Sequence, residues 1–128
     1  MPNKPDKFGI KFWLISDVST KYIINGFPNL GKEESRGAST PLGEFVVLKL
    51  LEPFTGCGIN ITTYNFFTRA SLSAKILEKN TIVGTICGNK RELPKFDKQA
   101  KDGMPRFSTK LYKSNPCSLI IYKSKPNK

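Results

Sequence analysis

Few side chains in this sequence could carry out chemistry. It contains no histidine, so the commonest general base and a favoured transition-metal ligand are both missing. No glycine-rich segment has the spacing of a phosphate-binding loop, and the Gly-Cys-Gly run at 56–58 is typical of a turn. Cys87 precedes Lys90 and Arg91, which could activate a nucleophilic thiol. We expect instead that Cys87 is buried and inert.

The elements that would position these residues can be predicted from composition and periodicity. Residues 9–16 and 21–25 are rich in β-branched and aromatic side chains and flank a short polar stretch, which predicts a β-hairpin. Asp17 lies in the expected turn, where its side chain can accept hydrogen bonds from backbone amides. Thr40 and Pro41 predict a helix start with Thr40 as N-cap, and Pro53 predicts the helix end. Its wide apolar surface is typical of a helix packed on a sheet.

A second strand and helix follow. Residues 59–67 predict a strand, and Thr68 predicts the N-cap of a helix over 69–79. Residues 81–87 (TIVGTIC) predict a short strand that is covered on both faces. The order of hairpin, helix, strand, helix and strand predicts an α/β fold with a mixed sheet. Several apolar side chains are expected in the core rather than in contact with a ligand: Trp13, Phe66, Phe67, Leu72, Ile76 and Leu77.

Several segments resemble one family of DNA-processing enzymes. Residues 60–68 read NITTYNFFT and are similar to the NITxDNFFTS signature of piggyBac-type transposases, which belong to the Asp-Asp-Asp strand-transfer enzymes. Further blocks resemble the same family in the same order, at 1–10 (MPNKPDKFGI), 17–31 (DVSTKYIINGFPNLG), 41–53 (PLGEFVVLKLLEP), 81–94 (TIVGTICGNKRELP) and 107–128. Agreement of several blocks in order is more specific than one short motif. The chain is identified as a member of this family on that basis.

The resemblance implies a fold and a domain organisation. It implies that residues 1–89 form a partial ribonuclease H-like core, which is a mixed sheet with flanking helices. It also implies that residues 90–128 begin a β-rich insertion, in which residues 118–122 (SLIIY) predict one strand. Relative to the family, the chain is expected to be truncated at both ends.

The resemblance also places the catalytic positions. Members of the family hold Mg²⁺ between three aspartates, and the cations stabilise the attacking and leaving oxygens of phosphodiester cleavage. The second of these positions corresponds to Tyr64, and the first and third lie outside the chain. A tyrosine phenol is neutral at pH 7 and is a poor ligand for a hard cation. The aspartates of this chain lie outside the family's ligand positions: Asp6, Asp17, Asp97 and Asp102. We therefore expect no intact catalytic residue, no metal site and no cofactor.

The charge of the chain predicts its partners. Its 21 Lys and Arg against 10 Asp and Glu give a net charge of +11, and most of the excess lies after residue 89. This asymmetry favours a polyanion, and with the resemblance it predicts weak, salt-sensitive DNA binding. Lys90 and Arg91 are the DNA-binding candidates, because they could contact phosphates. They could equally form a solvated basic loop in which Arg91 pairs with Glu92 or with a neighbouring carboxylate.

Other partners and the location follow from the same sequence. No run of apolar residues is long enough to span a membrane, so no membrane partner is expected. A missing first core strand would leave a sheet edge exposed, which predicts self-association through strand pairing. An odd number of cysteines without a CxxC pair favours a reducing intracellular compartment. The resemblance implies a nuclear location.

Three functional hypotheses follow. The first is a catalytically inactive fragment of a piggyBac-type transposase-derived protein with at most residual DNA binding, because Tyr64 replaces a catalytic aspartate. The second is a domesticated DNA- or chromatin-associated module that binds without catalysis. The third is an incomplete gene model of an active DNA transposase. The first hypothesis is favoured.

Overall fold

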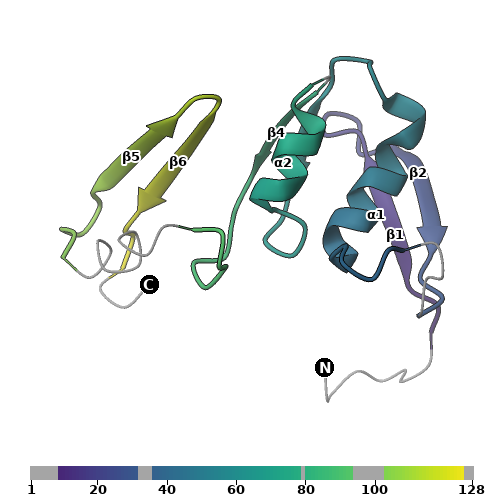
Figure 1. Cartoon of the computed structure of the whole chain (residues 1–128), viewed down its shortest axis with the longest axis horizontal. Coiled ribbons are helices and arrows are strands. Elements are labelled where there is room, and N and C mark those ends of the chain that lie inside the picture. The colour runs from purple at the N-terminus through teal and green to yellow at the C-terminus, as the bar shows by residue number, and fades with distance from the viewer. Residues whose placement is uncertain (1–8, 32–35, 79, 94–102, 126–128) are drawn as a thin grey trace. The chain divides into compact units, whose positions relative to one another are not determined.

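The computed structural model describes residues 9–31, 36–78, 80–93 and 103–125. The chain divides into two compact units, Met1–Ile86 and Cys87–Lys128. Over the described residues they contain two α-helices, one short 3-10 helix and three two-stranded sheets, so the fold is mixed α/β as predicted (Figure 1). The strands described do not form the one continuous sheet that was expected. The roles assigned to residues 1–89 and 90–128 as domains stay a prediction.

The first unit begins with the predicted hairpin. Strands β1 (Phe12–Ser16) and β2 (Ile23–Pro28) pair in antiparallel fashion. In the turn between them, Asp17 Oδ2 accepts hydrogen bonds from the Thr20 amide at 2.7 Å and from the Thr20 hydroxyl at 2.6 Å. The turn role predicted for Asp17 is therefore confirmed. The hydroxyl and amide of Thr20 favour the carboxylate form, so they hold the pKa of Asp17 below its usual value.

Helix α1 (Leu42–Leu51) begins later than predicted. Pro41 is its N-cap and makes no side-chain capping bond, so the prediction that Thr40 is the N-cap is wrong. Thr40 lies one residue too far from the first helical amides to cap them. At the other end the prediction is confirmed, because Pro53 lies in the 3-10 turn η1 (Glu52–Phe54) that ends the α-helix.

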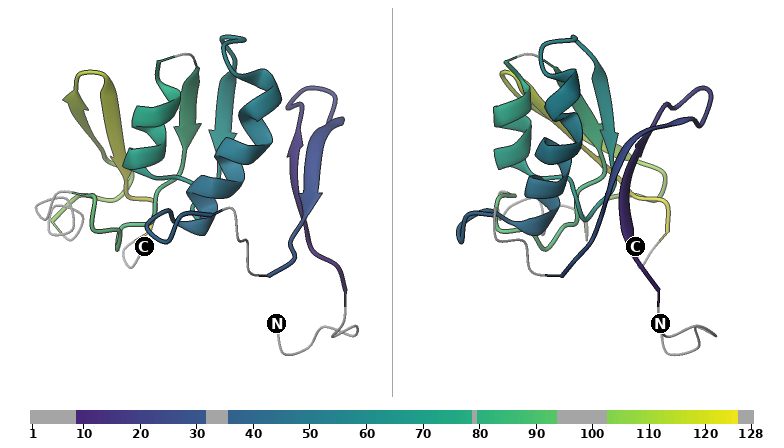
Figure 2. Two further views of the ribbon diagram at one scale, coloured as in Figure 1. Left: turned by 45° about the vertical axis from the view of Figure 1, so that its right-hand side comes forward. Right: turned by 90° about the vertical axis from the view of Figure 1, so that its right-hand side faces the viewer.

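The remaining elements of the first unit form a strand, helix and strand. β3 (Asn60–Thr63) and β4 (Thr81–Gly84) pair in parallel, and α2 (Ala70–Ile76) connects them. Both helices lie on the same side of this strand pair (Figure 2). Neither helix in the described part of the chain has the length and apolar character that crossing a membrane requires.

The boundaries of β3 and α2 differ from the prediction. β3 ends at Thr63 rather than continuing to residue 67, because the carbonyl of Tyr64 accepts a hydrogen bond from the Phe67 amide at 2.8 Å and closes a turn. The prediction that Thr68 caps α2 is wrong, since its hydroxyl bonds to the Tyr64 carbonyl at 3.1 Å and Arg69 is the N-cap. Aromatic residues thus continue past the point where the backbone turns.

Burial around β4 and the end of α2 also differs from the prediction. Leu77 is 41% exposed, because α2 ends at Ile76. β4 ends at Gly84, and Val83 is 60% exposed, so the prediction of a strand covered on both faces is wrong for the described residues. Only one face of this short pair is packed by helices.

The core of the first unit lies between the helices and the strands. One cluster joins α1, β3 and α2 through Val47, Leu51, Ile61, Leu72 and Ile76. A second joins β1 to α1 through Trp13, Val46 and Leu50. Burying each large apolar side chain stabilises the folded state by about 1.5–3 kcal/mol relative to leaving that side chain exposed. The packing of α1 on strands and the burial of Leu72 and Ile76 are as predicted.

The second unit contains one hairpin. β5 (Thr109–Ser114) pairs in antiparallel fashion with β6 (Cys117–Tyr122). β6 confirms the strand predicted over residues 118–122. β5 was not predicted, because lysines at 110 and 113 interrupt its apolar character. Leu111 and Ile120 are opposite each other in the register and are 64% and 65% exposed.

Candidate functional site

Tyr64 lies directly after β3 and has an exposed side chain, with 70% of its surface accessible. Its carbonyl accepts hydrogen bonds from the amides of Phe67 and Thr68 at 2.8 and 3.1 Å, so the backbone of the turn is fixed. Two glycines allow close packing around this turn. A β-carbon at Gly43 would lie 2.6 Å from the Phe66 carbonyl, and one at Gly84 would lie 2.4 Å from Thr63 Oγ1. The position of Tyr64 is therefore set by both α1 and β4.

Tyr64 lines a groove, here called the β1–β3 groove, with a volume of about 660 Å³. Its walls come from β1, the turn after it, β2, α1 and β3. Asp17 is its single charged lining residue among the described ones. The lining is otherwise apolar or neutral: Leu14, Ile15, Ser16, Val18, Ile24, Val47, Leu50, Leu51, Ile59, Asn60, Ile61, Thr62, Thr63, Tyr64 and Phe67. Such a surface suits an uncharged occupant better than a polyanion.

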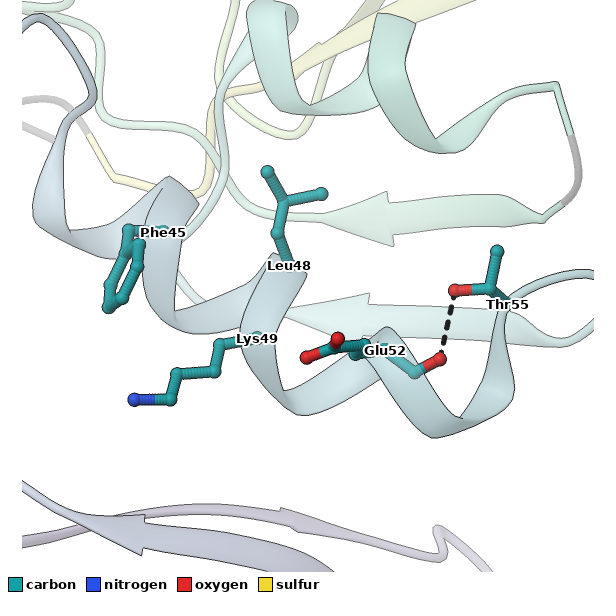
Figure 3. A pocket seen from close by; sticks show the side chains of 5 residues that line it. All are labelled: Phe45, Leu48, Lys49, Glu52 and Thr55. Atoms are coloured by element: carbon teal, nitrogen blue, oxygen red, sulfur yellow. Dashed lines mark hydrogen bonds between the residues drawn. The ribbon is translucent and has the colours of Figure 1, made fainter. Parts of the chain in front are cut away.

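A second hollow of about 470 Å³ lies along α1 and η1 (Figure 3). It is lined by Phe45, Leu48, Lys49, Glu52 and Thr55. The ammonium of Lys49 lies 4.3 Å from the ring centre of Phe27 and 5.5 Å from that of Phe45. These are the contacts of a helix packed against a hairpin, and none of them forms a nucleophile–base pair.

The DNA-binding candidates Lys90 and Arg91 lie in the second unit, in the turn that follows Cys87. The amide of Lys90 donates to the Cys87 carbonyl at 3.1 Å, and its own carbonyl accepts from Leu93 at 3.3 Å. Lys90 is partly buried, whereas Arg91 is exposed. Within the described residues Arg91 forms no salt bridge with Glu92. Tyr64 belongs to the first unit and this basic pair to the second.

Comparison with known proteins assigns the family. The family model described as Transposase IS4 matches residues 1–128, which is the full length of the chain. The chain belongs to this transposase family. A comparison with curated proteins finds no match.

Among solved structures, this transposase chain is similar to a piggyBac transposase, determined by cryo-EM as a synaptic complex with hairpin DNA. The two chains share 41% sequence identity with a TM-score of 0.86. The match covers 98% of the present chain and 27% of the other. The piggyBac-type resemblance seen in the sequence is therefore confirmed.

The donor atoms around Tyr64 do not fit the Mg²⁺ site that the transposase family implies. Hard divalent cations prefer carboxylate oxygens, and the end of β3 offers a phenol and two threonine hydroxyls. Those hydroxyls, on Thr63 and Thr68, are 2.8 Å apart and bond to each other. The carboxylate of Asp17 is engaged by Thr20. Among the described residues no group of three or more His, Cys, Asp or Glu could hold a metal ion.

The cysteines of this transposase chain are placed differently from the prediction. Cys57, Cys87 and Cys117 are all exposed, and none forms a disulfide. The prediction that Cys87 is buried is wrong, because β4 ends three residues earlier and leaves Cys87 in an open turn. No histidine is present to activate it.

Aromatic residues next to Tyr64 pack on the hairpin. Trp13 is 8% exposed and stacks on Phe66 with ring centres 6.0 Å apart, while Phe67 meets Trp13 edge-on at 5.8 Å. The ammonium of Lys11 lies 4.1 Å from the ring centre of Trp13. The prediction of core packing is confirmed for Trp13 and for Phe67, which is partly buried against both clusters. Phe66 is 49% exposed, so it forms the outer edge of the aromatic group.

Sequence reasoning missed a buried carboxylate. Glu44, in the first turn of α1, is only 2% exposed. Its carboxylate accepts a hydrogen bond from Ser71 Oγ at 2.7 Å and forms an ion pair with the ammonium of Lys75. Burial by itself would raise the pKa of Glu44, but the hydrogen bonds from Lys75 and Ser71 outweigh it and lower the pKa. This ion pair joins α1 to α2. The available signal was a carboxylate within the apolar run LGEFVVLKLL.

Proposed function

We propose that this chain is a catalytically inactive part of a piggyBac-type transposase core with weak, salt-sensitive affinity for DNA. The observation that carries the proposal is Tyr64, an exposed phenol at the end of β3 where the family signature has an aspartate. Without a carboxylate there, two cations would lack the ligand that bridges or orients them between the attacking and leaving oxygens.

The proposed core is ribonuclease H-like. In support of this, an antiparallel hairpin precedes a helix, and a parallel strand pair with its own crossover helix follows. The TM-score of 0.86 against a piggyBac transposase also favours one common architecture. The second unit would then begin the β-rich insertion, to which β5 and β6 would belong.

The proposed DNA affinity rests on charge. The net charge of +11 favours a polyanion, and the guanidinium of Arg91 is exposed. The similar transposase was determined together with hairpin DNA. Lys90 and Arg91 would bind phosphates rather than bases, so the affinity would depend little on sequence. A nuclear location is proposed from the family resemblance alone.

The absence of catalysis can be tested by incubating the chain with duplex and hairpin transposon ends and Mg²⁺. We expect no nicking by the chain or by its Tyr64→Asp variant, because one added carboxylate does not complete a two-cation site. Tyr22→Asp is the matched control, since Tyr22 is also 70% exposed but lies in the hairpin. Nicking that EDTA abolishes would refute the proposal.

DNA binding can be tested by fluorescence anisotropy with a labelled duplex over a range of salt concentrations. Each phosphate contact contributes about 0.9 to the slope of log affinity against log salt. Replacing both Lys90 and Arg91 by alanine should therefore reduce the slope by roughly 2. The matched control replaces Lys110 and Lys113, which are exposed in β5. An equal decrease of the salt slope in both double variants would show that only the net charge of the chain matters for binding. An affinity that does not change with salt concentration would refute the proposed DNA binding.

A further inference from the structure

Residues 36–41 (RGASTP), here called the acceptor segment, lie in the first unit between β2 and α1. The backbone turns at Ala38 and Ser39, and the amide of Thr40 donates to the Gly37 carbonyl at 3.0 Å. Ser39 is exposed and belongs to neither apolar cluster of the core. Another protein can therefore reach the Ser39 hydroxyl without disturbing the packing of the first unit.

The backbone of the acceptor segment can become extended at little cost. A protein kinase binds the residues around its acceptor as an extended strand, so these residues must be able to leave their local structure. The segment belongs to no helix or strand, and among the described residues the Thr40–Gly37 bond is the one hydrogen bond within it. Pro41 also favours an extended backbone at Thr40. The segment therefore meets the conformational requirement for a kinase substrate.

The charge of the acceptor segment defines the class of enzyme. Arg36 lies three residues before Ser39, is exposed, and is the single charged residue of the segment. A guanidinium presents a planar fork of donors that carboxylates bind in a bidentate geometry. One class of serine/threonine kinases uses an acidic pocket to select an arginine at this spacing. Arg36 and Ser39 fit that class.

Other hydroxyl groups do not combine these features. Among the described serines and threonines, only Ser39 and Thr109 follow a basic residue by three positions. Thr109 follows Arg106, but it lies in β5 and is paired with Tyr122 of β6, so its backbone is held in a ladder. Accessibility, a backbone free to extend and the arginine therefore occur together at Ser39.

We propose that Ser39 is a phosphorylation site for a serine/threonine kinase that selects an arginine three residues before the acceptor. Ser39 Oγ attacks the γ-phosphorus of ATP, the bond from that phosphorus to the β–γ bridging oxygen breaks, and ADP leaves. The hydroxyl proton passes to the catalytic aspartate of the kinase. The product carries a charge of about −1.5 to −2 at pH 7 shortly before α1, where a negative charge suits a helix start. The inference is independent of DNA binding.

Phosphorylation of the full, folded chain tests this proposal. The probe is a calmodulin-dependent protein kinase, which selects such an arginine, supplied with ATP and Mg²⁺. We expect the intact mass to increase by one phosphate per chain and fragmentation of the phosphopeptide to place that phosphate on Ser39. Ser39→Ala should abolish incorporation. Ser19→Ala is the matched control and should keep it, because Ser19 is also exposed in a turn but follows no basic residue at this spacing.

A second pair of variants tests the arginine. Arg36→Ala should lower kcat/KM of the kinase for this chain by at least about tenfold, the loss expected for one charge-assisted hydrogen bond. Arg106→Ala removes the same charge from the second unit and should leave kcat/KM unchanged. Unchanged far-UV circular dichroism shows that the variants fold.

Four results would overturn the proposal. The first two are no phosphate on the folded chain and a phosphate on Thr40 or Thr109 in place of Ser39. The others are incorporation that persists in Ser39→Ala and equal kcat/KM values for the two arginine variants.

Discussion

Replacing Lys75 by methionine should destabilise the first unit at neutral pH and much less in acid. The change removes the cation from the buried carboxylate of Glu44 while it keeps a long side chain in α2. Ser71 remains as a hydrogen-bond donor to the carboxylate. The Glu44 carboxylate, which is 2% exposed, then keeps the Ser71 hydroxyl and the charge of Arg69 but loses its ion-pair partner.

The size of this effect lies between two limits. Removing one partner of a buried ion pair costs roughly 3–5 kcal/mol, whereas an exposed pair contributes roughly 0–1 kcal/mol. The side chain of Lys75 is 53% exposed, so water replaces part of the lost contact. We therefore expect a loss of about 2 kcal/mol in the free energy of unfolding. For a domain of the size of the first unit (Met1–Ile86), a loss of about 2 kcal/mol lowers the Tm by roughly 8–16 °C.

The pH dependence has a defined sign. The folded-state pKa of Glu44 is lowered, so its carboxylate contributes stability above the unfolded pKa and loses it as the pH falls through the folded value. In Lys75→Met the carboxylate has lost its cation, so this contribution shrinks. The two chains should therefore differ at neutral pH and converge in acid, where Glu44 is protonated in both.

Urea unfolding followed by tryptophan fluorescence measures this difference, because Trp13 is the single tryptophan of the chain and lies in the first unit. Lys113→Met is the control, since Lys113 is exposed in the second unit. In a Glu44→Gln background, Lys75→Met should lower the free energy of unfolding by less than about 0.5 kcal/mol. Equal urea midpoints for Lys75→Met and Lys113→Met would refute the reasoning. A loss of unfolding free energy in Lys75→Met that stays the same in acid would also refute it.

Three further measurements check other parts of the structure. Gly84→Ala should destabilise the first unit by about 1–3 kcal/mol in urea, because a β-carbon would lie 2.7 Å from the Thr63 carbonyl oxygen, whereas Gly88→Ala has open space and should change little. In the hairpin turn, the protection factor of the Thr20 amide, which corrects for the intrinsic pH dependence of exchange, should be smaller in Asp17→Ala. In the unaltered chain it should decrease as the pH falls through the lowered pKa of Asp17. No change would contradict the turn assignment. The thiols of Cys57, Cys87 and Cys117 should all react with a maleimide in the folded chain, and a protected Cys87 would contradict its exposure.

Local signals in the sequence predicted the elements better than their ends. The hairpin, α1, β3, α2, β4 and β6 were each expected, because apolar periodicity and prolines mark them. The caps predicted at Thr40 and Thr68 were wrong, because Thr40 precedes the N-cap Pro41 and the Thr68 hydroxyl bonds to another group. Thr68 bonds to the Tyr64 carbonyl, which becomes available only because the chain turns there. β5 was missed because its lysines hide a strand that pairing with β6 stabilises.

The sequence by itself determined the family and the basic charge, and it predicted that Tyr64 replaces an aspartate, because each depends only on residue types and their order. Tertiary structure decided the burial of Glu44 beside Lys75, the exposure of Cys87 and the lining of the β1–β3 groove. Each of these depends on which segments meet in space. Residues 31 positions apart form the ion pair, and no local pattern specifies such a contact before the helices pack.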